Sequence, residues 1–168
     1  MKNCYSVEIG ENWLSYTDMN RFIKFWTQSA VDMFDDYLKI KMEDDIPENE
    51  LFDGMTRLNS SRFRSPTYFV MANSTKSERE RPILVVLYEE NKLKFLAWSP
   101  EDILQNVNGR DICRQIELDA LKDVERRKEL KKKLEENDEE DIRKQIRQLN
   151  EKLMEMEVRG KFSIVESS

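Results

Sequence analysis

Residues 82–98 read PILVVLYEENKLKFLAW and contain two apolar runs separated by a short polar connection. The run at 83–87 has no polar residue, which is typical of a strand that is covered on both faces. The connection Glu89-Glu90-Asn91 has the length and polarity found in β-hairpins. The stretch therefore predicts two antiparallel strands, at 82–88 and 92–98, as the centre of the fold.

Further elements are expected on either side of this hairpin. The apolar run at 67–72 predicts a strand, and the alternation at 161–165 predicts a returning edge strand, with Gly160 as the residue that breaks the preceding helix. The segment 99–109 begins with serine and proline and ends with glycine, so it predicts a short helix. The sequence thus predicts an α+β fold with a small, mainly antiparallel sheet.

Apolar side chains recur at helical spacing between residues 17 and 42, which predicts one long N-terminal amphipathic helix that packs on the sheet. A shorter helix is expected at 46–58, and the turn residues of 59–66 predict a surface loop. The members of the apolar stripe include Phe22, Trp26, Ala30, Phe34 and Leu38.

The chain after residue 112 has the composition of a charged helical tail. Acidic and polar residues at 135–138 interrupt the pattern, which favours two antiparallel helices folded as a hairpin over one continuous rod. In the second helix, apolar residues step by four, three, four and three, as in a coiled-coil seam of about two heptads. That seam is a candidate surface for protein contacts, and its members are Ile142, Ile146, Leu149, Leu153 and Met156.

These segments predict a compact α+β domain at 1–109, a charged helical hairpin or coiled-coil-like extension at 110–160, and a returning edge strand with a tail at 161–168. A chain of 168 residues is long enough for one ordinary core and an appendage. Charged residues make up 37% of the chain, which implies long stretches whose faces meet water.

The net charge of −6 and the absence of histidine exclude several classes of function. An acidic chain has no general attraction to nucleic acid or to an anionic membrane. Without histidine there is no Ser-His-Asp or Cys-His nucleophile and no common type of zinc site. The four glycines are isolated from one another, so the sequence has no phosphate-binding glycine loop, and no cofactor is expected.

Cysteine usage and hydropathy predict where the chain is found. Cys4 and Cys113 are the only cysteines, and a secreted chain of this length more often carries a larger even set. Residues 1–10 have no sustained apolar run, and no stretch approaches the roughly 20 apolar residues that span a bilayer. We therefore expect reduced thiols, a cytoplasmic location and no membrane partner.

Carboxylates are frequent between residues 32 and 53. We expect most of them to form a solvated face, and a metal site is not favoured. The alternative is a surface that meets a basic partner, as in an acidic inhibitor that occupies the nucleic-acid-binding groove of another protein. The candidate interaction residues of this stretch are Asp35, Asp36, Asp44 and Asp45.

Glu90-Asn91-Lys92 has the acid-x-lysine spacing that metal-dependent nucleases place beside the scissile phosphate. Such a site also needs an acid on an adjacent strand to share the metal ion, and Asp53 is the upstream candidate. Because Glu90 is expected in a hairpin turn, a plain turn is the favoured interpretation. The nuclease hypothesis remains an alternative, and the sequence favours a non-enzyme.

Two basic clusters are candidates for contact with nucleic acid. The first is a pair of arginines on either side of Phe63, a pattern suited to phosphate contacts and base stacking. The second is a run of three lysines in the helical tail, which neighbouring acids interrupt and follow. Compensated surface charge is the favoured interpretation of both, and their members are Arg62, Arg64, Lys131, Lys132 and Lys133.

Taken together, the sequence favours a non-enzymatic module for protein–protein interaction or assembly. The missing catalytic sets, the charge-segregated tail and the short seam support a role in which the tail contacts protein partners or a second copy. The alternatives are a divergent metal-dependent nuclease or nucleic-acid-binding protein, and an acidic inhibitor. Nucleic acid is the less favoured partner.

Overall fold

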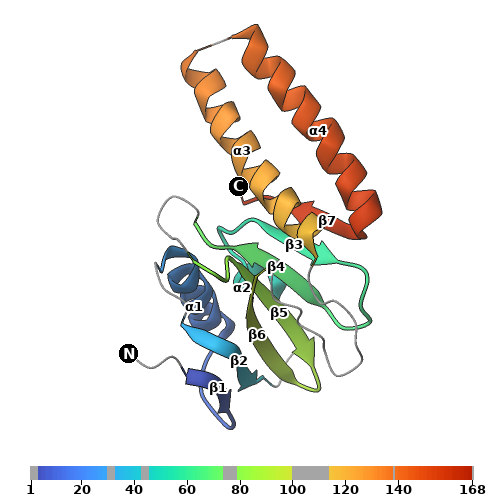
Figure 1. The fold of residues 1–168 in the computed structure, drawn as a ribbon. Coiled ribbons are helices and arrows are strands. Elements are labelled where there is room, and N and C mark those ends of the chain that lie inside the picture. The colour runs from blue at the N-terminus through green and yellow to red at the C-terminus, as the bar shows by residue number, and fades with distance from the viewer. Residues whose placement is uncertain are drawn as a thin grey trace.

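The structure of the protein is a computed structural model, and it describes residues 4–29, 33–42, 46–73, 79–99, 114–137 and 139–167. For residues 4, 5 and 34–36 it describes the backbone alone. Within these ranges the chain forms four helices and seven strands (Figure 1). In chain order they are β1 (Cys4–Ile9), α1 (Tyr16–Gln28), β2 (Phe34–Lys41), α2 (Glu48–Leu51), β3 (Arg57–Ser60), β4 (Thr67–Met71), β5 (Ile83–Glu89), β6 (Lys92–Trp98), α3 (Gln115–Glu136), α4 (Glu140–Gly160) and β7 (Phe162–Val165).

The seven described strands belong to one sheet, in the order β1-β2-β6-β5-β4-β3-β7. β1 and β2 are parallel, and the other neighbouring pairs are antiparallel. The α+β class is therefore confirmed, but the sheet is larger than the small one expected. The predicted central hairpin is β5 and β6, whose two-residue turn holds Glu90 and Asn91 at φ values of 51° and 57°, as a type I′ turn requires. Apart from Ser99, the helix predicted at 99–109 lies outside the described residues.

The single helix predicted from residue 17 to residue 42 is wrong. Helix α1 ends at Gln28, and residues 34–41 form the strand β2 between β1 and β6. The apolar residues used for the prediction recur every four positions, and four is also a multiple of the strand period of two. In β2, Leu38 and Ile40 accordingly point to the same side of the sheet, into a core cluster that they share with α1.

The interpretation of residues 46–66 is also corrected. In place of a helix at 46–58, only α2 is helical, and residues 57–60 form the strand β3 between β4 and β7. The surface loop predicted at 59–66 is consequently shorter, because it begins after residue 60. This four-residue strand lies between β4, which follows it along the chain, and the distant β7, so its own short sequence is not enough to predict it.

A polar network holds α2 against β3 and β4. Glu48 Oε2 accepts hydrogen bonds from Arg57 Nη2 (3.0 Å) and Asn59 Nδ2 (3.1 Å), and Glu48 Oε1 accepts one from Tyr68 Oη (3.0 Å). Burial raises the pKa of the Tyr68 phenol, and the hydrogen bond to the Glu48 carboxylate raises it further. Tyr68 is therefore a neutral donor over the physiological pH range, and the network has a structural role.

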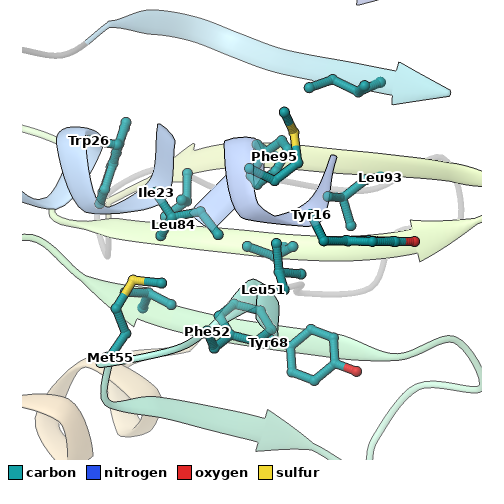
Figure 2. Close-up of a cluster of buried hydrophobic side chains, with 14 of the residues drawn as sticks. Tyr16, Ile23, Trp26, Leu51, Phe52, Met55, Tyr68, Leu84, Leu93 and Phe95 are labelled. Carbon is teal, nitrogen blue, oxygen red and sulfur yellow. The ribbon is translucent and has the colours of Figure 1, made fainter. Parts of the chain in front are cut away.

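Side chains on the two faces of the sheet form two core clusters. One lies between the sheet and the helices α1 and α2 (Figure 2) and contains the fully buried Trp26 and Phe95. The other lies on the opposite face, where α3 contributes Leu121 and α4 contributes Leu153. Alternate residues of β5 between 83 and 87 enter the two clusters, which confirms that this strand is covered on both faces.

Helices α3 and α4 form an antiparallel pair, so the predicted helical hairpin is confirmed and the continuous rod is wrong. In Figure 1 the pair stands beside β3 and β7 and extends beyond the sheet. Lys152 Nζ lies 2.6 Å from Asp123 Oδ2, and Arg127 Nη1 donates to Asn150 Oδ1 (2.7 Å), so polar contacts join the two helices.

The C-terminal strand β7 is the edge strand that the alternation at 161–165 predicts. The role predicted for Gly160 is different, however. Gly160 is the last residue of α4, and Lys161 takes the left-handed conformation (φ 54°). A Cβ atom at position 160 would overlap the ring of Phe162, so close packing and not backbone angle requires the glycine.

Candidate protein-interaction site

The connection between β1 and α1 presents a tryptophan to solvent. Of the three tryptophans of the chain, Trp26 and Trp98 are buried, whereas Trp13 has a relative exposure of 102%. The neighbouring Leu14 is also exposed. We call residues 10–15 the tryptophan loop. A large aromatic side chain gains free energy from burial, so complete exposure of an indole marks a surface that a partner can cover.

Hydrogen bonds from one asparagine fix the tryptophan loop. Asn12 Nδ2 donates to the carbonyl oxygens of Gly10 (2.7 Å) and Lys41 (3.1 Å), and the backbone N–H of Leu14 donates to Asn12 Oδ1 (2.9 Å). The bond to Lys41 ties the loop to the end of β2. Trp13 therefore projects from an ordered backbone, and little conformational entropy is lost when the loop binds a partner.

The end of the loop is fixed by the start of the next helix. Ser15 Oγ accepts a hydrogen bond from the backbone N–H of Asp18 (3.2 Å), and Asp18 Oδ2 accepts one from the backbone N–H of Ser15 (2.9 Å). This reciprocal pair is a capping box. The hydrogen bond from the Ser15 backbone lowers the pKa of Asp18, so the cap is ionised and complete at neutral pH.

A hollow of about 830 Å³ lies beside Trp13, between the tryptophan loop, the end of β2 and α2. Its volume is typical of pockets that receive a large side chain or a small ligand. Its lining combines apolar side chains with charged side chains of both signs: Trp13, Leu14, Tyr16 and Met42 are apolar, and Glu11, Lys41 and Glu50 are charged and exposed.

This arrangement suits recognition of another protein. Tryptophan is over-represented among the few residues that supply most of the binding free energy of interfaces, and such residues fill pockets on the partner. A polar rim around an apolar centre is the usual anatomy of an interface. The tryptophan loop and its hollow have both features on one surface.

Of the four acidic residues expected to meet a basic partner, the structure describes the position of only two. Asp35 and Asp36 lie in strand β2, so the helical face on which they were expected does not exist. Asp44 and Asp45 lie outside the described residues. The hypothesis that these acids meet a basic partner stays a prediction.

The seam of α4 faces the rest of the chain along much of its length. Leu149 and Leu153 are buried, and Leu153 belongs to the core cluster that α3 and α4 form with the sheet. Ile142 and Ile146 are partly exposed near the far end of the hairpin. Only the first turns of the seam therefore have surface to offer to a partner.

The residues proposed for a nuclease site have separate partners. Asp53 Oδ2 lies 3.6 Å from Lys24 Nζ of α1, whereas Lys92 Nζ lies 2.8 Å from Glu8 Oε1 of β1. The Lys92 ammonium lowers the pKa of Glu8, and Glu8 raises the pKa of Lys92. Glu90 is an exposed residue of the β5–β6 turn. Within the described part of the chain, no group of three or more Cys, Asp or Glu side chains is arranged to hold a metal ion.

The two basic clusters lie apart. Arg62 is 15% exposed and its Nη2 lies 2.9 Å from Glu117 Oε1 near the start of α3, whereas Arg64 is exposed. The lysines at 131–133 are exposed on the outer half of α3. From residue 117 to residue 131 the helix rises by about 21 Å, so one small ligand does not contact both clusters.

Trp13 is not among the site residues predicted from the sequence, because it belongs to no apolar stripe. The available signal was a tryptophan–leucine pair between polar residues, directly before a serine that caps a helix. Such a pair is equally compatible with burial under a neighbouring element. Only the tertiary structure shows that the indole is uncovered.

Comparisons with known proteins found no match for the chain among protein-family models, curated proteins or solved structures. Among the described helices, none is both long enough and apolar enough to cross a bilayer. Function is therefore inferred from the site itself.

Proposed function

We propose that the protein is a non-enzymatic protein-interaction module that binds a second copy of itself through the tryptophan loop. The observation that carries this proposal is the complete exposure of Trp13 on a loop that hydrogen bonds hold in place. The contact would remove from water an indole that the isolated chain leaves fully hydrated.

A second copy fits because the surface is self-complementary. In a twofold dimer the same patch is used on both copies, so a protruding group needs a matching hollow nearby. Trp13 protrudes beside a hollow whose lining includes the buried side chains of Tyr16 and Met42. The exposed Lys41 and Glu50 supply both signs of charge on that patch, so each can meet its opposite on the other copy.

The expected contribution of Trp13 is large enough to measure. A tryptophan buries about 150–250 Å² at an interface. Truncation of a central aromatic residue costs at least about 2 kcal/mol of binding free energy, which is roughly a thirtyfold change in the dissociation constant. Loss of this one side chain should therefore raise the concentration at which half of the chains dimerise by roughly thirtyfold.

Light scattering coupled to size exclusion tests the proposal. The full chain should approach the dimer mass as its concentration rises, and Trp13→Ala should remain a monomer. Phe25→Ala is the matched control, because Phe25 is an exposed aromatic residue (62%) on α1 that does not line the hollow. A chain that is monomeric at every concentration would rule out a second copy as the partner. Equal dimerisation of Trp13→Ala would rule out the tryptophan loop.

A second candidate surface is the outer face of the helical hairpin, the charged tail expected to carry assembly. Met154 and Val158 are 67% and 80% exposed, and their spacing places them side by side on α4. Met154→Lys with Val158→Lys should disrupt the dimer if this face is the interface. If the tryptophan loop is the interface, the same double variant should dimerise like the wild type.

A further inference from the structure

The indole of Trp13 carries a hydrogen-bond donor that loses its water when the side chain is buried. Trp13 is fully exposed, and its Nε1–H has no hydrogen-bond partner among the described residues. A buried indole usually donates this N–H to an acceptor, because an unmade hydrogen bond costs free energy. An interface that covers Trp13 therefore needs an acceptor at the place where the indole enters.

The hollow beside Trp13 offers two carboxylates as acceptors. Asn12 and Ser15 also line it, but their side-chain oxygens already accept hydrogen bonds that fix the tryptophan loop and cap α1. The carboxylates of the lining belong to Glu11 and Glu50, and a carboxylate is a stronger acceptor than a neutral oxygen. We therefore expect an indole that enters the hollow to donate to one of these two.

One of the two carboxylates is held in place. Thr17 Oγ1 of α1 donates to Glu50 Oε1 (2.7 Å), whereas Glu50 Oε2 accepts no hydrogen bond from a described residue. Within the described part of the chain, the exposed Glu11 carboxylate has no donor that would position it. Glu50 thus presents a positioned carboxylate with one oxygen still available, and a further hydrogen bond costs less ordering entropy there than at Glu11.

In a twofold dimer the tryptophan of each copy meets the hollow of the other. We propose that Trp13 Nε1–H donates to Glu50 Oε2 of the second copy, and that this reciprocal pair of hydrogen bonds makes the surface specific for a second copy. A protein that lacks this surface cannot form both bonds, so the pair discriminates against other partners. The inference rests on the proposed dimer and adds the group that recognises the indole.

A double-mutant cycle on the full chain, with dimer dissociation constants from analytical ultracentrifugation, tests the proposal. Trp13→Phe keeps an aromatic ring but removes the N–H, and Glu50→Ala removes the acceptor; both positions are exposed, so neither change disturbs the core. Each should weaken dimerisation at least about tenfold, because a hydrogen bond to a charged group is lost. The double variant should bind at least about tenfold more tightly than the product of the two single losses predicts, because both changes delete the same bond.

The matched control is Glu11→Ala, which removes the other carboxylate of the lining and should show no such coupling to Trp13→Phe. Coupling at Glu11 in place of Glu50 would overturn the proposal, because it would assign the acceptor to Glu11.

A mixture of the two single variants shows whether the bond crosses the interface. A dimer of one Trp13→Phe copy and one Glu50→Ala copy keeps one complete donor–acceptor pair, whereas either homodimer keeps none. In native mass spectrometry of an equimolar mixture, with one variant isotope-labelled, heterodimers should exceed the statistical half of all dimers. A statistical mixture, or single losses that multiply, would overturn the proposal while dimerisation through the tryptophan loop stands. A wild type that is monomeric at every concentration would overturn both.

Discussion

The turn from α4 into β7 depends on two adjacent residues with opposite requirements. Gly160 has helical backbone angles but no room for a side chain, because the ring of Phe162 folds back over it. Lys161 has room for its side chain but a left-handed backbone (φ 54°) that favours glycine. The sequence places its glycine where packing, and not the backbone angle, demands it.

Gly160→Ala should lower the free energy of unfolding by about 1–3 kcal/mol, because the added methyl group displaces the Phe162 ring. Lys161→Gly, the control at the next position, relieves the left-handed conformation and should raise that free energy by no more than about 1 kcal/mol. Urea unfolding followed by circular dichroism measures both changes. A neutral Gly160→Ala would mean that the ring moves freely and that close packing does not select the glycine.

The carboxylate of Glu117 is fully buried and joins three parts of the chain. Oε1 accepts hydrogen bonds from Arg62 Nη2 (2.9 Å) and Arg114 Nη2 (2.8 Å), and Oε2 accepts one from the backbone N–H of Arg114 (2.8 Å). Arg114 Nη2 also donates to the carbonyl oxygen of Gly160 (2.7 Å). The loop after β3, the start of α3 and the end of α4 therefore meet at one side chain.

Glu117→Leu should lower the free energy of unfolding by about 3–5 kcal/mol, because it removes a fully buried carboxylate that accepts hydrogen bonds from two arginine side chains and one backbone N–H. Glu155→Leu is the control: Glu155 forms an exposed i,i+4 pair with Arg159 (3.6 Å), and its loss should change the free energy by about 0.5 kcal/mol or less. Chemical denaturation compares the two. Similar losses at both positions would contradict a special role for the buried carboxylate.

Strand β2 shows where local patterns stop being informative. The strands β4, β5, β6 and β7 and the helical hairpin could be predicted, because each has a run, an alternation or a break that only one type of element explains. The apolar spacing of four in β2 fits a helix and a strand equally, and the pairing of β2 with β6 decides between them. The same ambiguity hid the pairing of residues 39–41 with residues 92–94, since 92–94 was placed in a strand but 39–41 in a helix.

The base of the helical hairpin is part of the core of the molecule. Leu153 of α4 is buried in the cluster that α3, α4 and the sheet share, whereas Val158 on the same helix is exposed. Leu153→Ala should therefore lower the free energy of unfolding by about 2–5 kcal/mol, and Val158→Ala should change it by about 0.5 kcal/mol or less. Thermal and urea unfolding measure the difference. If Leu153→Ala were as stable as Val158→Ala, the hairpin would not be docked on the sheet.

Lys41 supports the tryptophan loop in two ways. Its backbone carbonyl accepts the hydrogen bond from Asn12 that fixes the loop, and its side chain lines the hollow beside Trp13. Lys41→Gln should therefore weaken dimerisation, whereas Lys39→Gln, two residues earlier on β2 and outside the hollow, should not. Light scattering on the two variants checks this, and indistinguishable effects on dimerisation would contradict the proposed dimer contact.

The exposed tryptophan gives the whole molecule a built-in reporter of its central contact. Trp26 and Trp98 are buried, so an external quencher such as acrylamide acts mainly on the fluorescence of Trp13. The most direct measurement is the acrylamide quenching constant of the full chain over a wide range of protein concentration, with Trp13→Phe as the baseline. We predict that the quenching constant falls and the emission shifts to shorter wavelength as the concentration rises, while the baseline stays flat. A quenching constant that is high and independent of concentration would contradict binding of a second copy through the tryptophan loop.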